Sequence, residues 1–316
     1  MNALAVVLNA PEQIALQTLA LKPPSPGQIV VQIEWSGISA GTERLLWSGR
    51  MPHFPGMGYP LVPGYESVGR VIGGDLGAPA AAHLRLGDRV FVPGASCYSD
   101  VRGLFGGAAS RVVVPAARLF VVAEELGDQA VLLALAATAE HALAGGDGSP
   151  AELIIGHGVL GRLLARLSLL RGGSPVVWEK NPDRRAGAVG YTVCDPDHDP
   201  RPAYRSIYDV SGDAALLPTL ISRLQRGGEI VLAGFYSEPL SFAFAPAFLK
   251  EARLRVAAEW QPADLQAVCA LAASHRLALD GLISHRSPFD QAPAAYARAF
   301  ADPHCLKMLL DWRACS

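Results

Sequence analysis

The feature that most constrains this chain is the stretch at 153–161, which reads LIIGHGVLG. An apolar run typical of a strand ends there in Gly-x-Gly-x-x-Gly, and the repeat of a helix follows at once, which is the context of a dinucleotide-binding motif. Gly156 allows a tight turn, Gly158 lets the backbone approach a pyrophosphate, and Gly161 lets the helix pack close to the strand. Free N–H groups at the start of that helix attract phosphates. We therefore predict a dinucleotide site formed by Gly156, His157, Gly158, Val159, Leu160 and Gly161.

Length and charge set outer limits on function. The 316 residues are enough for two domains of ordinary size. A formal net charge of −2 shows no footprint for nucleic acid, so no such partner is expected. No apolar run reaches the roughly 18 residues of a spanning helix, so stable membrane insertion is not expected. The five cysteines are scattered without a C-x-x-C pair, which favours a reducing cytoplasm.

Three regions with different patterns follow one another along the chain. Residues 1–124 read as short strands separated by Pro and Gly, which predicts an all-β, barrel-like unit with long loops. Residues 125–261 alternate strands with helices, which predicts a doubly wound parallel sheet. Residues 262–316 contain two helical patterns and a final strand. The predicted fold class is therefore α/β with a second, barrel-like domain.

The acid that follows the second strand of the nucleotide region indicates the cofactor. Glu179 lies about 18 residues after Gly161, where a carboxylate binds the adenosine ribose hydroxyls and repels a 2′-phosphate. It favours NAD over NADP, although Lys180, Arg184 and Arg185 place cations nearby. Residues at the ends of later strands are expected near the nicotinamide, or, for Phe235, in packing between domains. The predicted cofactor set is completed by Lys180, Ser211, Gly234 and Phe235.

Two loops of the first region resemble motifs of the medium-chain dehydrogenase/reductase superfamily. The loop 59–69, YPLVPGYESVG, resembles the family's G-H-E-x-x-G, with Tyr65 in place of His. The loop 35–44, WSGISAGTER, resembles G-[IV]-C-G-[ST]-[DE], with Ser39-Ala40 where the zinc-ligating Cys falls. The resemblance covers nearly the whole chain. It implies a GroES-like β-barrel catalytic domain at 1–124, completed by 262–316, and a Rossmann NAD-binding domain at 125–261.

The departures from these motifs predict chemistry without a metal. A catalytic zinc takes three protein ligands, typically Cys and His, and two of the three expected positions hold Ser39 or Ala40 and Tyr65. The third position, near 136–138, has no Cys or His either. We therefore predict no metal. The alternative is that Glu66, His53 and His141 converge; against it, Glu66 reads as a buried structural carboxylate.

Without a metal, a hydroxyl must bind the substrate oxygen or take its proton. By resemblance, Thr42 falls where alcohol dehydrogenases of the family place such a hydroxyl. Tyr65 falls where a zinc ligand would point at the same oxygen, or it fills the space that the ligand vacates. The predicted catalytic set is Thr42, Tyr65, Ser39 and Glu66.

The segment 45–60 is dense in aromatic residues, Met, Gly and Pro, and cannot form a regular helix. Its side chains suit a large, flat, apolar ligand, or the loop folds on its own apolar residues. A second glycine-rich loop, 95–107, could close the other side of a pocket. The predicted substrate-binding residues are Trp47, Met51, Phe54, Met57, Tyr59, Tyr98, Phe105 and Trp260.

A narrower resemblance is carried by the segments 35–39, 45–51, 54–66 and 210–213. They are similar to the dehydrogenases that act on a hydroxyethyl chlorin in bacteriochlorophyll a synthesis. The resemblance implies a small-molecule chlorin substrate whose C3 1-hydroxyethyl group becomes acetyl, with NAD as cofactor. The wider family implies a homodimer paired through the sheet edge near 254–258. Two alternatives stay open: a zinc-free quinone or enone reductase, which would prefer NADPH, and a non-catalytic nucleotide-binding pigment carrier.

Overall fold

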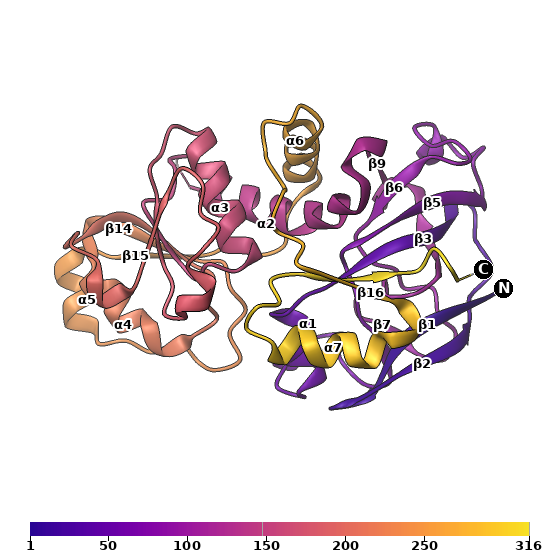
Figure 1. Ribbon diagram of the computed structural model, residues 1–316, viewed down its shortest axis with the longest axis horizontal. Helices are drawn as coiled ribbons and strands as arrows, with labels where there is room; N and C mark the ends of the chain where they lie inside the picture. The colour runs from indigo at the N-terminus through magenta and orange to yellow at the C-terminus, as the bar shows by residue number, and fades with distance from the viewer. Residues whose placement is uncertain (147, 316) are drawn as a thin grey trace. The chain divides into compact units, whose positions relative to one another are not determined.

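The computed structural model describes residues 1–146 and 148–315 (Figure 1). The chain divides into two compact units, each with its own core. Unit 1 comprises residues 1–134 and 282–316, and unit 2 comprises residues 135–281. Within the described residues, no helix has the length and apolar character needed to cross a membrane.

Unit 1 contains two sheets of short strands, in line with its Pro- and Gly-punctuated sequence. β3 (Gln28–Ile38) lies inside the larger sheet, and most of its side chains are buried. The smaller sheet runs in the order β2 (Gln13–Ala20), β1 (Asn2–Ala10), β4 (Leu61–Val62), β7 (Arg102–Gly103). The larger sheet runs in the order β16 (His285–Pro288), β17 (Met308–Asp311), β3, β5 (Ser67–Gly74), β6 (Arg89–Val92), β9 (Phe120–Val121), and β8 (Arg111–Pro115) also pairs with β3.

The end of the chain is built into unit 1. β17 runs antiparallel to β3, with Met308 opposite Ile38. Trp312 is fully buried, and its Nε1 donates to Ser36 Oγ at 2.8 Å. Helix α7 (Ala292–Ala301), drawn in yellow in Figure 1, packs its small residues and Tyr296 into the same core as β1 and β3. The loops after β3 and before β5 are therefore held in part by the last residues of the chain.

Unit 2 is a doubly wound, six-stranded sheet in which every pairing is parallel, so the predicted fold class is confirmed. Its order is β12 (Thr192–Cys194), β11 (Val176–Trp178), β10 (Leu153–Ile155), β13 (Tyr204–Asp209), β14 (Leu224–Leu232), β15 (Arg253–Val256). The order reverses beside β10, which is where such sheets bind a ligand. The helices are α2 (Leu133–Ala144), α3 (Val159–Leu170), α4 (Leu217–Ser222), α5 (Phe244–Lys250) and α6 (Pro262–Ala273).

The divisions between the units lie after Ala134 and Gly281, and differ from the expected 124 and 261. The 3₁₀ segment η3 (Glu124–Leu132) packs against β3 and β5, which extends unit 1 beyond residue 124. Helix α6 belongs to unit 2, where His141 Nδ1 on α2 lies 2.8 Å from Asp264 Oδ2. Both differences come from contacts between residues far apart in sequence, which the local patterns do not contain.

Candidate active site

Three hydroxyl groups of unit 1 meet at the predicted catalytic loops. Ser39 follows the end of β3, and its Oγ lies 2.7 Å from the phenolic oxygen of Tyr65. The Thr42 hydroxyl, at the first position of α1 (Thr42–Trp47), interacts with the same phenol. Burial, then the charge of Glu66, raises the pKa of Tyr65 well above its usual value, so the phenol is neutral at physiological pH. The structure thus brings the hydroxyls of Ser39, Thr42 and Tyr65 together in one group, which is called the hydroxyl relay below.

The fourth predicted catalytic residue, Glu66, is fully buried and has a different kind of partner. Its Oε2 lies 2.6 Å from Nζ of Lys307, which also donates to the carbonyl oxygen of Ile38 at 3.2 Å. A Cβ on Gly37 would stand 2.4 Å from Glu66 Oε2, so the site needs glycine there. Lys307 therefore holds both Ile38, which precedes Ser39, and Glu66, which follows Tyr65. Glu66 itself is buried beneath the site and does not reach its surface.

A further acid in this group was not selected from the sequence. Glu43, in the first turn of α1, is fully buried, and the Tyr296 phenol of α7 lies close enough to influence its ionisation. Burial, then the charge of Glu66, raises the pKa of Glu43 to about 8. One sign of it in the sequence is that an acid directly follows Thr42, a predicted catalytic residue.

The alternative metal ligands do not form one donor set. His141 belongs to unit 2 and pairs with Asp264, whereas Glu66 pairs with Lys307 inside unit 1. His53 is exposed on the loop after α1. Among residues 1–146 and 148–315, no group of three or more His, Cys, Asp or Glu side chains could hold a metal ion. Where the dehydrogenase motif has the zinc ligands Cys and His, this chain has the hydroxyl groups of Ser39 and Tyr65.

The predicted aromatic loop forms a small core of its own beside the hydroxyl relay. Tyr65 packs edge-on against Phe105, with ring centroids 5.2 Å apart. The partly exposed rim of this core, called the aromatic rim below, consists of Trp47, Phe54, Met57, Tyr59 and Phe105. Met51 lies inside the same core with 7% of its surface exposed. Both alternatives raised by the sequence therefore hold: the loop packs on its own apolar side chains and still presents apolar surface next to Tyr65.

Two of the predicted substrate residues are not part of the aromatic rim. Tyr98 is buried in the main core of unit 1, and its hydroxyl donates to the carbonyl oxygen of Gly106 at 2.6 Å, so its ring offers no surface to a ligand. Trp260 follows β15 in unit 2, whereas the other predicted substrate residues belong to unit 1. An aromatic residue in a glycine-rich loop does not reveal on which side of the loop it packs.

The glycine-rich turn of unit 2 has the geometry of a phosphate cradle. Gly156 adopts φ +102°, which disfavours any side chain, and a Cβ on Gly161 would stand 1.9 Å from the carbonyl oxygen of Gly156. Gly158 is the N-cap of the twelve-residue helix α3, has no side-chain cap, and has open space where a Cβ would lie. Val159 and Leu160 form the first turn. The free N–H groups there fit the pyrophosphate of a dinucleotide.

Residues at the ends of neighbouring strands meet beside this cradle. A Cβ on Gly156 would lie 3.7 Å from the backbone of Ser211, and one on Gly234 would lie 3.0 Å from the nitrogen of Gly212. Ser211 is held by Asp209, whose Oδ1 accepts from its backbone nitrogen at 2.9 Å. Phe235, which follows Gly234, is 46% exposed. The predicted cofactor residues Gly156, Ser211 and Gly234 are thus neighbours in unit 2.

Glu179 is oriented by backbone groups at the end of β11. Its Oε2 accepts from the His157 nitrogen at 3.0 Å, and its Oε1 accepts from the Asn181 nitrogen at 2.9 Å. Arg185 is turned toward backbone, donating to the carbonyl oxygens of Glu179 and Lys180 at 2.7 and 2.8 Å. The carboxylate is therefore fixed beside the glycine-rich turn, and Lys180 is left exposed.

The side chain of His157, which is predicted from the sequence to bind the cofactor, instead makes buried structural contacts. It is fully buried, with Nδ1 2.7 Å from the carbonyl oxygen of Arg184 and Nε2 2.9 Å from the Tyr191 hydroxyl. The buried guanidinium of Arg162 donates to the carbonyl oxygens of His157 and Ala186 at 3.0 and 2.9 Å. Together these side chains tie the glycine-rich turn to the loop after β11. Only the backbone of His157 stays at the cradle.

Replacing His157 by glutamine should reduce the loss of unfolding free energy as the pH is lowered from 6.5 to 4. Burial lowers the pKa of His157 from 6.5 to about 4, so the unfolded chain binds the proton first. Stability therefore falls as pH drops from 6.5 to 4, by on the order of 3 kcal/mol for this group. Urea unfolding at a series of pH values measures the slope. His157→Gln should lose less stability over this window, and the exposed His198→Gln should behave as wild type; equal slopes in all three proteins would contradict the assignment.

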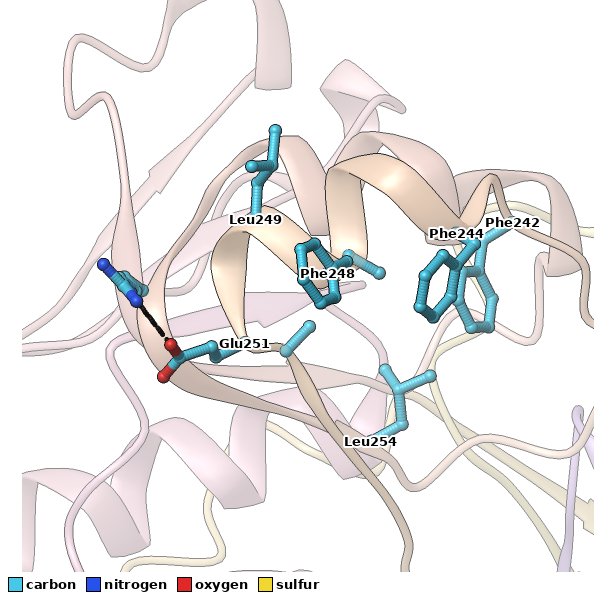
Figure 2. Close-up of a pocket in the computed structure, with 9 residues that line it drawn as sticks. Phe242, Phe244, Phe248, Leu249, Glu251 and Leu254 are labelled. Atoms are coloured by element: carbon cyan, nitrogen blue, oxygen red, sulfur yellow. Dashed lines mark hydrogen bonds and ion pairs between the residues drawn. The ribbon is translucent and has the colours of Figure 1, made fainter.

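Unit 2 also carries an exposed apolar hollow of about 420 Å³ (Figure 2). Figure 2 shows Phe244, Phe248 and Leu249 on α5 and Leu254 on the edge strand β15. The rings of Phe244 and Phe248 are 5.6 Å apart, and Phe244 is 74% exposed. Exposed apolar side chains gathered in this way mark an interaction surface.

Comparison with known proteins agrees with this architecture. Residues 25–124 match the family described as the alcohol dehydrogenase GroES-like domain. A curated relative, the 2-desacetyl-2-hydroxyethyl bacteriochlorophyllide A dehydrogenase of Rhodobacter capsulatus, is 56% identical over 315 residues, which cover 99% of this chain and 99% of the relative.

Solved structures share the fold of the whole chain. A short chain alcohol dehydrogenase from Escherichia coli, complexed with the cofactor NADH, superposes with a TM-score of 0.83 at 22% identity, covering 98% of this chain and 99% of the other. A putative zinc-binding dehydrogenase from Sinorhizobium meliloti, bound to NADP, gives a TM-score of 0.81 at 21% identity with the same coverage.

Proposed function

Because the chain belongs to the family of the 2-desacetyl-2-hydroxyethyl bacteriochlorophyllide A dehydrogenases, within the medium-chain dehydrogenase superfamily, we propose that it oxidises the C3 1-hydroxyethyl group of bacteriochlorophyllide a to acetyl. The membership confirms the narrower resemblance, to 3-hydroxyethyl bacteriochlorophyllide a dehydrogenase, that the motifs predict. The observation that carries the proposal is 56% identity along the full length of both chains. The hydroxyl relay and the aromatic rim of unit 1 support it.

In the proposed reaction, the hydroxyl relay accepts the proton that the carbinol oxygen loses. The carbinol O–H donates to the phenolic oxygen of Tyr65, or to Thr42 beside it, as the Tyr65 proton passes to Ser39 Oγ at 2.7 Å. Ser39 in turn gives its own hydroxyl proton to water, so each relay oxygen keeps one proton and only the carbinol loses one. No metal is needed for this step, because positioned hydroxyls can both hold the oxygen and move its proton.

The substrate is a large, flat ring with the reacting group on one edge. The aromatic rim offers apolar and π surface directly beside Tyr65, so the macrocycle can pack on Trp47, Phe54 or Met57 while only its hydroxyethyl edge reaches the relay. Apolar burial of this kind fixes orientation without hydrogen bonds. It explains why a loop rich in Met and aromatic residues lies next to the relay.

Unit 2 is proposed to hold NAD in the cradle at Gly156, Gly158 and Gly161. The bound nicotinamide supplies the hydride acceptor, which is the only chemistry it adds. Glu179 is fixed by two backbone N–H groups and keeps lone pairs free for the ribose hydroxyls, which favours NAD over NADP.

Glu179→Gln should weaken the preference for NAD. The neutral amide no longer repels a 2′-phosphate and accepts fewer hydrogen bonds from the ribose, so we expect KM for NAD⁺ to rise about tenfold and the gap to NADP⁺ to narrow. Initial rates with each cofactor measure this. The exposed Asp183→Asn, in the same loop, is the matched control and should leave both constants unchanged. If the ratio of kcat/KM for NAD⁺ to kcat/KM for NADP⁺ were unaltered in Glu179→Gln, the basis for the NAD assignment would be lost.

A direct assay separates the proposed function from its alternatives. The protein is mixed with hydroxyethyl bacteriochlorophyllide and NAD⁺, and absorbance is followed for NADH and for a shifted chlorin band. Formation of both supports the dehydrogenase. Chlorin binding without NADH would indicate the non-catalytic carrier, and turnover of quinones or enones with NADPH alone would indicate the reductase. Family membership favours neither alternative.

The chain is further proposed to work as a homodimer. β15 is the last strand in the order of the unit 2 sheet, and its exposed Leu254 continues the apolar hollow of α5 (Figure 2). An unpaired sheet edge beside exposed Phe and Leu side chains can pair with the same edge of a second copy. The predicted contact near 254–258 is therefore widened to include Phe244 and Phe248.

A further inference from the structure

A group of buried oxygens near the hydroxyl relay has no partner among the described residues. Both carboxyl oxygens of Glu43, Oε1 of Glu66 and the hydroxyl of Tyr296 have no partner at hydrogen-bond geometry, although the Tyr296 phenol lies near enough to Glu43 to lower its pKa. All three side chains are at most 1% exposed. They come from α1, from the loop before β5 and from α7, so the chain brings them together from distant positions. Because a buried polar atom without a hydrogen-bond partner destabilises the folded state, a cluster of such atoms in one place requires an explanation.

The charges of this group do not balance if both acids are ionised. Lys307 is the cation that influences the group, and its Nζ is engaged by Glu66 at 2.6 Å. No described side chain forms an ion pair with Glu43. A fully buried carboxylate without a counter-charge is expensive, and such groups bind a proton instead. Two nearby carboxyls that share one cation behave in the same way, because both cannot ionise cheaply.

We propose that Glu43 is a protonated carboxylic acid at physiological pH, so that Glu43, Glu66 and Lys307 form a neutral group of one acid, one carboxylate and one ammonium. The Glu43 O–H adds a donor to a group whose carboxyl oxygens lack one, and the Tyr296 O–H can donate to the remaining oxygen of Glu43. The proton therefore satisfies the buried oxygens and the charge count together.

The surroundings of Glu43 support this on every side. Glu66 raises its pKa, while Tyr296 on α7, Lys307 before β17 and a backbone group of Ser39 lower it in part. Burial outweighs these, and the pKa stands at about 8, against 4.5 for an ordinary glutamate. Glu43 also raises the pKa of the Tyr65 phenol, so the charge of Glu43 is felt at the hydroxyl relay.

Glu43 is thereby a positioning residue, because its charge affects the reaction through Tyr65. This role rests on the proposed function. As the carbinol loses its proton, negative charge develops on the oxygens of the relay. An ionised Glu43 would add a second uncompensated negative charge close by and oppose that step. Turnover should therefore decline as pH rises through 8, by about tenfold between pH 8 and pH 9.5 at an effective dielectric constant of about 20.

The first test reads the proton itself and does not depend on activity. Infrared difference spectra of the wild-type protein, titrated from pH 6.5 to pH 9.5, should show the loss of the carbonyl stretch of a protonated carboxylic acid. Glu43→Gln should abolish that change, and Glu140→Gln, at a paired carboxylate of unit 2, should retain it. A wild-type spectrum without such a band, or a band that survives in Glu43→Gln, would overturn the proposal.

The second test is the pH profile of turnover. Glu43→Gln imitates the neutral acid, so its rate at pH 7 should stay within about twofold of wild type, and its decline above pH 8 should disappear. Glu140→Gln should follow the wild-type profile. A Glu43→Gln protein that is slow at every pH would show that the ionised form is needed, contrary to the proposal. Absence of turnover in the wild type would instead count against the proposed function, and the infrared result would stand independently.

Discussion

Tyr65→Phe is expected to lower kcat/KM for the hydroxyethyl chlorin by about 10²–10³-fold, the usual contribution of a group that transfers a proton in the transition state. The phenol lies 2.7 Å from Ser39 Oγ and interacts with Thr42, so its oxygen is the centre of the relay. Phenylalanine keeps the edge-on contact with Phe105 and removes only this oxygen. The constants for the dinucleotide should not change, because the cradle belongs to unit 2.

Matched variants separate loss of chemistry from loss of structure. Tyr98→Phe removes another buried hydroxyl of unit 1, one that donates to Gly106, and should reduce stability while leaving turnover near normal. Thr42→Ala tests the neighbouring hydroxyl. Near-normal turnover in both Tyr65→Phe and Thr42→Ala would refute the relay. Ser39→Ala combined with Tyr65→Phe should cost little more than Tyr65→Phe alone, because the two hydroxyls act as one chain.

Lys307→Met is expected to destabilise unit 1 by about 3–5 kcal/mol, the cost of leaving a buried charge without its partner. The ammonium is 3% exposed and serves both Glu66 and the carbonyl oxygen of Ile38. Its removal leaves the Glu66 carboxylate buried and unpaired. Urea unfolding monitored by circular dichroism at pH 7 measures the loss, which should appear in the transition of unit 1 and spare that of unit 2.

A double substitution tests the physical reason. Lys307→Met with Glu66→Leu replaces both charges by apolar groups and should recover much of the lost stability, as buried ion pairs exchanged for hydrophobic residues do. Arg298→Met removes one side of an exposed pair with Asp302 and should move the unfolding midpoint little. If Lys307→Met were as harmless as Arg298→Met, the buried pair would not hold the two loops.

The parts of this protein that sequence predicts are those set by local rules. The turn at Gly156–Gly161 follows from glycine geometry, and the structure has φ +102° at Gly156 and no room for a side chain at Gly161. Strand and helix types in unit 2 follow from the alternation of apolar patterns, and the parallel sheet is confirmed. Ser39 and Tyr65 could be paired because both replace metal ligands, which must meet at one point.

The parts that could not be predicted depend on contacts across long distances in sequence. Lys307 meets Glu66 241 residues away, and nothing local marks it as buried. His157 lies within the dinucleotide motif, yet its ring is drawn into unit 2 by Tyr191 and by the carbonyl oxygen of Arg184. The side on which Tyr98 packs is decided by the core around it. Each case is a polar or aromatic group whose partner is chosen by tertiary structure.

The pairing of β17 with β3 has a consequence for synthesis in the cell. Lys307 contacts the carbonyl oxygen of Ile38 at a sequence separation of 269, and the whole of unit 2 is inserted between them. A growing chain therefore presents β3 as an incomplete edge until its final residues leave the ribosome, whereas unit 2 is contiguous and can fold earlier. The hydroxyl relay lies early in the sequence but is completed last, so we expect a chain without its closing strand to keep the fold of unit 2 and to lose the turnover proposed for the relay.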